Sequence, residues 1–101
     1  MSVVNTIGWF FSGVFVVNTL PHLIHGVSGE KFPSPFDKPR GKKLSSPTLN
    51  VIWAFINLSI FLMIFYFNLS SFTAIQGVIM LVGAFAMAIF LSRYFTGKGD
   101  E

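Results

Sequence analysis

The sequence contains no cysteine and few charged residues, and these two absences restrict the classes of protein that it can encode. Without cysteine, a disulfide framework, a zinc–thiolate site and a thiol nucleophile are excluded. Only 11% of the 101 residues are charged and 52% are hydrophobic, whereas a soluble globular domain has about 25% charged residues. The chain is too short for two ordinary domains, so we expect a single transmembrane domain over residues 1–101.

Three long hydrophobic runs predict an all-α membrane protein with three transmembrane helices, at about residues 3–27, 47–68 and 73–95. No charged side chain interrupts these runs before Arg93. At about 1.5 Å per residue, roughly 20 residues cross the hydrocarbon layer, so each run is long enough. The helices have no polar face, which argues against a soluble helical bundle. The runs also lack the alternation that is typical of a transmembrane β-barrel.

Proline and serine positions bear on where the helices begin and end. No basic residue precedes the first run and no small-x-small cleavage site follows it, so we interpret this run as a retained helix and not as a signal peptide. Pro21 lacks the amide hydrogen for a helical bond and crowds the preceding turn. The first helix therefore either kinks at Pro21 or ends there, with a short interfacial helix beginning. Ser46 is suited to cap the second helix, and Pro47 to occupy its first position.

The basic residues predict the orientation in the membrane. In a protein with three spans, the connection at residues 28–46 and the C-terminus lie on the same side. That side holds all 7 Lys and Arg residues, so the positive-inside rule makes it cytoplasmic and places the N-terminus outside. Nucleic-acid binding is not expected from so few basic residues. Part of the connection can also attract anionic lipid headgroups, through Lys38, Arg40, Lys42 and Lys43.

Polar residues of the first two helices are spaced so that they would face one another. Asn18, His22 and His25 follow the spacing i, i+4, i+7, which puts them on one face of an unbroken helix. The second helix runs back through the membrane, and its two asparagines, seven residues apart, also share a face. We therefore expect a polar cluster in the cytoplasmic half that is a candidate ligand site, formed by Asn18, His22, His25, Asn50, Trp53 and Asn57.

Plainer interpretations apply to the same residues. Asparagines in transmembrane helices often serve as interhelical hydrogen-bonding groups, at about 0.6 kcal/mol per bond. The histidines would be interfacial anchors, or would line a small-ligand or quinone-type pocket. Metal or haem on His22 and His25 would need a third ligand, which the sequence does not supply in a rigid element.

No acidic or basic residue lies deep in a span, which disfavours proton or cation transport, and no acid is placed to orient a Ser–His pair. The sequence predicts neither a catalytic residue nor a cofactor.

Small residues are concentrated along the third predicted helix. Glycine and alanine let helix backbones approach closely, so a stripe of them is a packing signal. The stripe would face the first two helices, a second copy of the chain or another membrane protein. Its members are Gly77, Ala84 and Ala88, with Gly83 and Ala86 adjacent.

Several short motifs occur together between Asn18 and Asn57. As a set, they resemble those of a group of small uncharacterised bacterial three-helix integral membrane proteins. The resemblance implies a bacterial inner-membrane location and implies no catalytic activity. The motifs are Asn18-x-x-Pro21-His22, Gly26-x-x-Gly29, Phe32-Pro33-Ser34-Pro35-Phe36 and Leu44-Ser45-Ser46-Pro47.

Three functions are compatible with these observations, and an enzymatic activity is not the favoured one. The leading interpretation is a structural or accessory membrane subunit that associates with itself or with another membrane protein, in addition to the lipid bilayer. The alternative is a small-molecule binding or transport module with a polar pocket in the cytoplasmic half of the first two helices. The third is a redox subunit that holds a metal or haem on His22 and His25.

Overall fold

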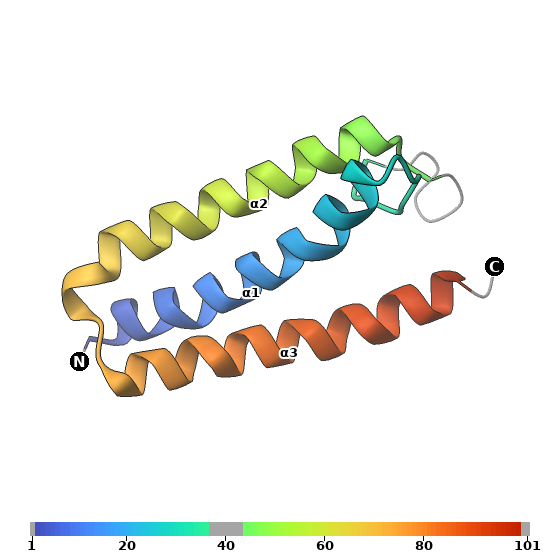
Figure 1. Ribbon diagram of the computed structural model, residues 1–101. Coiled ribbons are helices and arrows are strands. Elements are labelled where there is room, and N and C mark those ends of the chain that lie inside the picture. Colours follow the sequence, from blue (N-terminus) through green and yellow to red (C-terminus); the bar gives the residue numbers. More distant parts are fainter. Residues whose placement is uncertain (1, 37–43, 100–101) are drawn as a thin grey trace.

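Three long helices form the protein, and the first of them lies between the other two (Figure 1). The computed structural model describes residues 2–36 and 44–99. The central helix packs against both neighbours, which hardly contact each other. A short 3-10 helix joins the second and third helices at one end, here called the turn end, and the opposite end is the loop end. The elements are α1 (Val3–Val27), α2 (Pro47–Asn68), η1 (Leu69–Ser71) and α3 (Ala74–Gly99).

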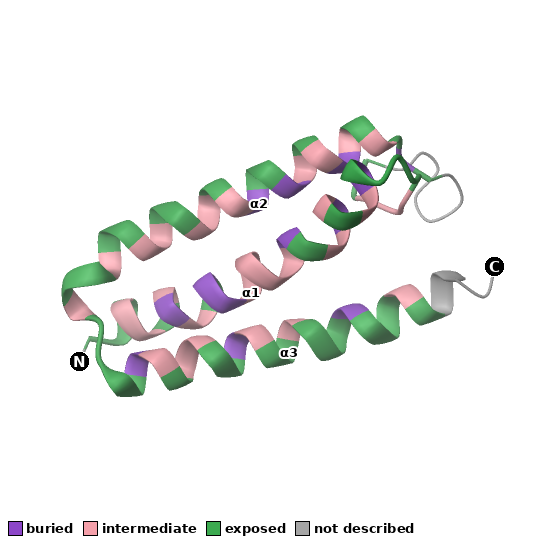
Figure 2. Cartoon of the chain, viewed as in Figure 1, coloured by how far each residue is buried: buried purple, intermediate pink, exposed green. Residues whose placement is uncertain are grey.

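The dimensions and the surface of the bundle fit a lipid environment. All three helices are long and apolar enough to cross a membrane, and the bundle is 44 Å long, close to the roughly 40–45 Å of a bilayer with its headgroups. Most of the outer surface of the helices is exposed apolar side chain, whereas the buried positions form a narrow inner stripe (Figure 2). In the described part of the chain, the buried hydrophobic residues are Trp9, Ala54 and Leu91, and the buried polar residues are Ser12, Thr19, His22, Ser45, Asn50, Asn57 and Gln76.

Helix α1 continues through Pro21 and ends in a Schellman motif six residues later. Of the two predicted alternatives, a helix that ends at Pro21 is therefore wrong. Gly29 adopts φ 74°, a left-handed conformation that costs glycine little. The Gly29 amide donates to the Gly26 carbonyl at 3.1 Å, and the Glu30 amide donates to the His25 carbonyl at 2.9 Å. These two bonds satisfy carbonyl groups that a helix end leaves without partners.

Hydroxyl side chains cap the other helices. Ser46 Oγ accepts a hydrogen bond from the Leu49 amide at 3.1 Å, and Pro47 occupies the first position of α2, as predicted. Thr73 Oγ1 accepts from the Gln76 amide at 3.3 Å at the start of α3. Helix α3 runs to Gly99, past the predicted end at residue 95. The difference arises because the helical backbone continues through residues that are too polar for the hydrophobic layer.

Two glycines bring α1 and α3 together near their midpoints. A Cβ atom added to Gly13 would overlap the Met80 carbonyl oxygen and lie 2.7 Å from the Ala84 amide nitrogen. A Cβ atom added to Gly83 would overlap the Phe10 carbonyl oxygen and lie 2.9 Å from its carbonyl carbon. Backbone therefore packs directly on backbone at this crossing, which only small residues permit.

An indole ring and an amide fill the turn end of the bundle. Trp9 is fully buried, and its ring lies edge-on to Phe65 and Phe72, with centroid distances of 5.5 and 4.9 Å. Its Nε1 donates to Ser71 Oγ at 3.3 Å, so its one polar atom is satisfied. Gln76 is also buried, but its Nε2 reaches only Thr6 Oγ1, at 3.4 Å. Its Oε1 has no hydrogen-bond partner among the residues that the structure describes.

We expect Gly83→Ala to lower the free energy of unfolding by about 1–3 kcal/mol, the usual cost of overpacking a close contact. Gly77→Ala is the matched control on the same helix, because its Cβ would lie 3.3 Å from the tip of the Phe72 ring and meet no backbone. This control should be nearly neutral, since alanine favours a helix more than glycine does. Unfolding in mixed detergent micelles, followed by circular dichroism, measures both. Equal losses would contradict the close α1–α3 approach.

Candidate functional site

Two asparagines of α2 face α1, and each meets one polar side chain there. Asn57 Oδ1 accepts a hydrogen bond from Asn18 Nδ2 at 2.9 Å, and Asn50 Oδ1 lies 2.8 Å from His22 Nδ1. Asn50 and Asn57 are 0% and 1% exposed, and their separation of seven residues places them on one face of α2. The polar side chains of α1 and α2 therefore meet as two separate pairs, whose members lie about one turn apart on α1 and two turns apart on α2.

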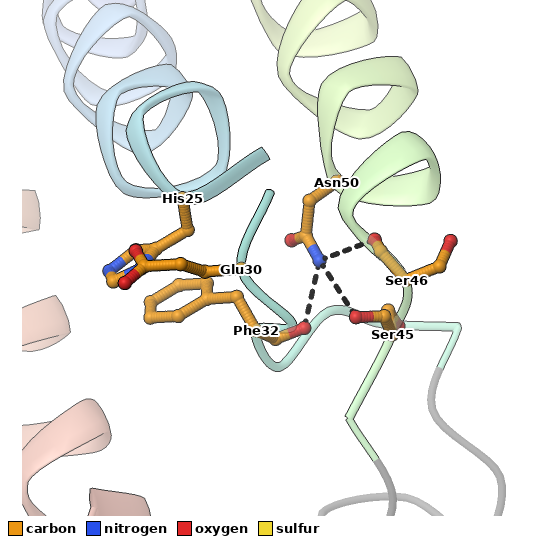
Figure 3. Close-up of polar contacts among 6 residues, drawn as sticks. All are labelled: His25, Glu30, Phe32, Ser45, Ser46 and Asn50. Atoms are coloured by element: carbon orange, nitrogen blue, oxygen red, sulfur yellow. Dashed lines mark hydrogen bonds and ion pairs between the residues drawn. The ribbon is translucent and has the colours of Figure 1, made fainter. Parts of the chain in front are cut away.

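The Asn50 amide also ties the segment after α1 to the start of α2 (Figure 3). Its Nδ2 donates to the carbonyls of Phe32 at 2.9 Å, Ser46 at 3.1 Å and, more weakly, Ser45 at 3.4 Å. Phe32 and Ser45 also pair as a single antiparallel bridge, with N···O distances of 3.2 and 3.1 Å. One buried side chain thus connects α2 to α1 through His22 and to both sides of the loop.

Aromatic contacts place the two histidines in different surroundings. His25 stacks on Phe32, with ring centroids 4.0 Å apart and an interplanar angle of 11°, and its Nδ1 lies 2.8 Å from Glu30 Oε1 at the exposed edge of the loop end. His22 meets the edges of the Phe32 and Trp53 rings, at 5.5 and 6.4 Å. The two imidazole rings therefore have different polar partners, Asn50 for His22 and Glu30 for His25. Among residues 2–36 and 44–96, no three His, Asp or Glu side chains gather in a way that could hold a metal ion.

A cavity of about 270 Å³ lies at the loop end, beside His22. Helix α1 contributes its two polar residues, α2 contributes Trp53, the loop contributes a short proline-rich stretch, and α3 contributes a largely aromatic wall. None of the described lining residues is Asp, Glu, Lys or Arg. The lining residues are Asn18, His22, Pro33, Ser34, Pro35, Trp53, Met87, Phe90, Leu91, Tyr94 and Phe95.

The residues predicted from sequence for the ligand site fall into three groups. Asn18, His22 and Trp53 line the cavity. Asn50 and Asn57 lie behind the cavity lining, where Asn50 is hydrogen-bonded to His22 and Asn57 to Asn18. His25 belongs to the exposed contact with Glu30, which lies outside the cavity lining.

The small residues of α3 also differ in what they contact. Gly83 is buried against α1, and Ala84 contributes backbone to the same crossing. Gly77 lies near the Phe72 ring, and Ala88 is exposed. The four basic residues predicted to contact anionic lipid, Lys38, Arg40, Lys42 and Lys43, lie outside the described residues.

The contribution of α3 to the cavity was missed from sequence. Its last turns carry Phe90, Leu91, Tyr94 and Phe95, all of which line the cavity. A signal was available: α1 and α3 run in the same direction, so the final third of α3 lies at the depth of Asn18 and His22 (Figure 1). A comparison of the depths of the helices in the membrane, and not side-chain polarity, would have identified these α3 residues as part of the cavity lining.

We expect Asn50→Leu to lower the free energy of unfolding by at least about 2 kcal/mol, because buried carbonyls and His22 Nδ1 would lose a partner without gaining water. Gln76→Leu is the matched control, a buried amide whose Oε1 already lacks a partner in the described residues. Its cost should be below about 1 kcal/mol. Denaturant titration of both variants in the same detergent measures the difference. Similar losses would show that Asn50 does not connect the loop end as the contacts indicate.

The chain was compared with protein-family models, curated proteins and solved structures. No family model matches it, and neither a curated protein nor a solved structure does.

Proposed function

We propose that the protein is a multi-pass membrane protein that binds a small lipid-soluble molecule with a ring-shaped head in the cavity at the loop end. The observation that carries this proposal is the cavity itself: its lining combines two polar side chains of α1 with the rings of Trp53, Phe90 and Tyr94. Ligand sites typically combine a mostly apolar, aromatic lining with a few placed polar groups.

The position of the cavity supports access from the lipid. Tryptophan and tyrosine favour the membrane–water interface, so Trp53 and Tyr94 suggest a depth near the headgroups of one leaflet. Helices α2 and α3 both pack on α1 but hardly on each other. A molecule in that leaflet would therefore reach the cavity sideways, between the loop-end halves of α2 and α3.

The size of the cavity supports a small head group. Its volume of about 270 Å³ is just below the roughly 300–1,000 Å³ of pockets that enclose a drug-sized ligand. One ring system would fit, while a hydrocarbon tail would remain among the lipids. A quinone-type or phenolic lipid has this shape.

The orientation follows from the basic residues and is part of the proposal. The described parts of the loop, residues 28–36 and 44–46, lie at the same end of the bundle as the last turns of α3 (Figure 1). In the sequence, all 7 Lys and Arg residues fall within residues 28–46 or 93–98. Under the positive-inside rule the loop end faces the cytoplasm of a bacterial cell, and the cavity opens toward the inner leaflet of its inner membrane. The basic residues of the loop would then contact anionic headgroups there.

Two other functions have less support from the contacts. A subunit that binds a partner through the small residues of α3 would need that face to be accessible, but Gly83 and Ala84 already pack against α1. A metal or haem shared by His22 and His25 would need both rings to converge. Instead, His22 Nδ1 meets Asn50 and His25 Nδ1 meets Glu30.

We expect a small molecule to co-purify with the protein and to be lost from Leu91→Trp. Leu91 is 8% exposed and lines the cavity, so the larger ring would fill the space that a ligand needs. Leu81→Trp is the matched control, since Leu81 lies on the same helix and is 68% exposed. Solvent extraction followed by mass spectrometry compares the two variants with the wild type. If no compound depends on residue 91, and Met87→Phe is equally without effect, cavity binding is excluded.

We also expect the site after Glu101 to lie in the cytoplasm and the η1 turn to lie outside. A fluorescent protein should then be active only after Glu101, and alkaline phosphatase only in the η1 turn. The reason is the single-sided distribution of the basic residues. Paired alkaline phosphatase and fluorescent-protein fusions at the two sites provide the measurement. Phosphatase activity at the C-terminal site would reverse the assigned leaflet.

A further inference from the structure

The segment Phe32–Phe36 has an aromatic ring at each end, and the two rings contact different helices. The Phe36 ring lies edge-on to Trp53 of α2, with a centroid distance of 5.5 Å. The Phe32 ring lies against Phe95 of α3, at 4.6 Å. The three residues between the rings line the cavity. This segment, here called the strap, therefore connects α2 to α3 across the loop end of the cavity.

The backbone of the strap is attached to the α2 side. The Phe32 carbonyl accepts a hydrogen bond from Asn50 Nδ2 at 2.9 Å, and Phe32 pairs through its backbone with Ser45, just before α2. The Phe32 ring lies on the opposite side, against His25 (Figure 3), on which it stacks at 4.0 Å. Truncation of this side chain therefore leaves the bonds to the α2 side in place and removes the ring contacts with α1 and α3.

Two prolines make the strap a stiff connection. The rings of Pro33 and Pro35 lock φ at about −65°. Each proline also restricts the residue before it, Phe32 or Ser34, to extended conformations. A stiff segment keeps its two end rings at a fixed separation, so it can determine how far apart α2 and α3 lie at the loop end.

The loop-end third of α3 depends on contacts of its own. Helices α2 and α3 hardly contact each other, and the close contact of α3 with α1 lies near the middle of the helix, at Gly83. Phe95 lies about 18 Å farther along α3 than Gly83, at about 1.5 Å per residue. The contact between the Phe32 and Phe95 rings thus acts where the helix is far from its tightest packing.

We propose that Phe32 is a positioning residue which, through Phe95, sets the width of the lateral entrance between α2 and α3; this inference rests on the proposed ligand-binding function. Separation of the two rings lets the entrance widen. Phe32 does not line the cavity in the part of the chain that the structure describes. It therefore controls how fast a lipid-soluble molecule enters and leaves, while the lining residues determine how tightly the molecule binds.

The width of the entrance can be measured without any ligand. The chain has no cysteine, so Ile52→Cys with Ser92→Cys gives one spin-label pair at the loop end. Met63→Cys with Ile75→Cys gives a second pair at the turn end, and all four positions are exposed. In lipid nanodiscs, we expect Phe32→Ala to add a loop-end distance component about 3–4 Å longer, the clearance that a planar ring needs. The turn-end distance should stay unchanged.

Phe95→Ala should reproduce the loop-end change, because it removes the other ring of the same contact. Phe85→Ala is the matched control on α3, since Phe85 is 67% exposed, and it should leave both distances as in the wild type. If neither Phe32→Ala nor Phe95→Ala lengthens the loop-end distance, the proposal is overturned. A change at both ends of the bundle also overturns it, because Phe32 would then stabilise the whole fold and not the entrance.

The rate of entry can be tested with 2-naphthol, a fluorescent ring compound, using the full chain in lipid nanodiscs and empty nanodiscs as the blank. Stopped-flow fluorescence gives the binding and release rates, and equilibrium titration gives the affinity. Phe32→Ala should raise both rates by about tenfold, the change to which loss of one aromatic pair corresponds. The Kd should change much less than either rate, whereas Phe85→Ala should alter neither.

The outcomes separate the two proposals. If both rates stay at the wild-type values, or if only the release rate rises so that affinity falls with it, the role of Phe32 at the entrance is wrong while the cavity remains a binding site. If no probe binds above the blank, or if Leu91→Trp binds it as well as the wild type does, the proposed function itself fails, and the role of Phe32 fails with it.

Discussion

The hydrogen bonds of the Asn50 amide are the interaction on which the loop end depends. In apolar surroundings water does not replace a missing partner, so a buried amide stays satisfied only while all the groups around it keep their places. Asn50 contacts His22 of α1 and the carbonyls of Phe32 and Ser45, the two residues that pair in the loop bridge. The proline-rich stretch that borders the cavity follows directly after Phe32, so the position of that wall depends on the same amide.

Helix α1 holds its two neighbours by different physical means. Toward α3 it presents Gly13, which lets two backbones touch. Toward α2 it presents Asn18 and His22, which are paired by hydrogen bonds. Apolar area contributes little preference for a partner when the lipid is as apolar as the side chains, so close packing and polar pairs decide which helices meet. This explains why the interior of the bundle is largely polar while its surface is apolar.

The parts of this structure that were predictable from sequence are those with a strong local signal. Hydrophobic run length predicted the three helices, and Ser46 with Pro47 marked the start of α2. Helical spacing and depth put His22 and Asn50 within reach of one another. The contribution of α3 to the cavity was not predictable from polarity, because that helix is apolar all round and its pattern does not distinguish lipid from protein. The continuation of α1 past Pro21 was also left open, since proline allows both a kink and an end.

The crossing of α1 and α3 has a mechanical consequence for the aromatic wall. Near the middle of both helices, Gly13 packs on the backbone of α3 and Gly83 packs on the backbone of α1, whereas Tyr94 lies about 16 Å farther along α3 than Gly83 at about 1.5 Å per residue. A tilt of α3 by about 5° around this pivot would move the Tyr94 region by about 1.4 Å, because displacement grows with distance along a rigid rod. The glycine contact thus acts as the pivot of α3. A small tilt there changes the width of the opening between the loop-end halves of α2 and α3.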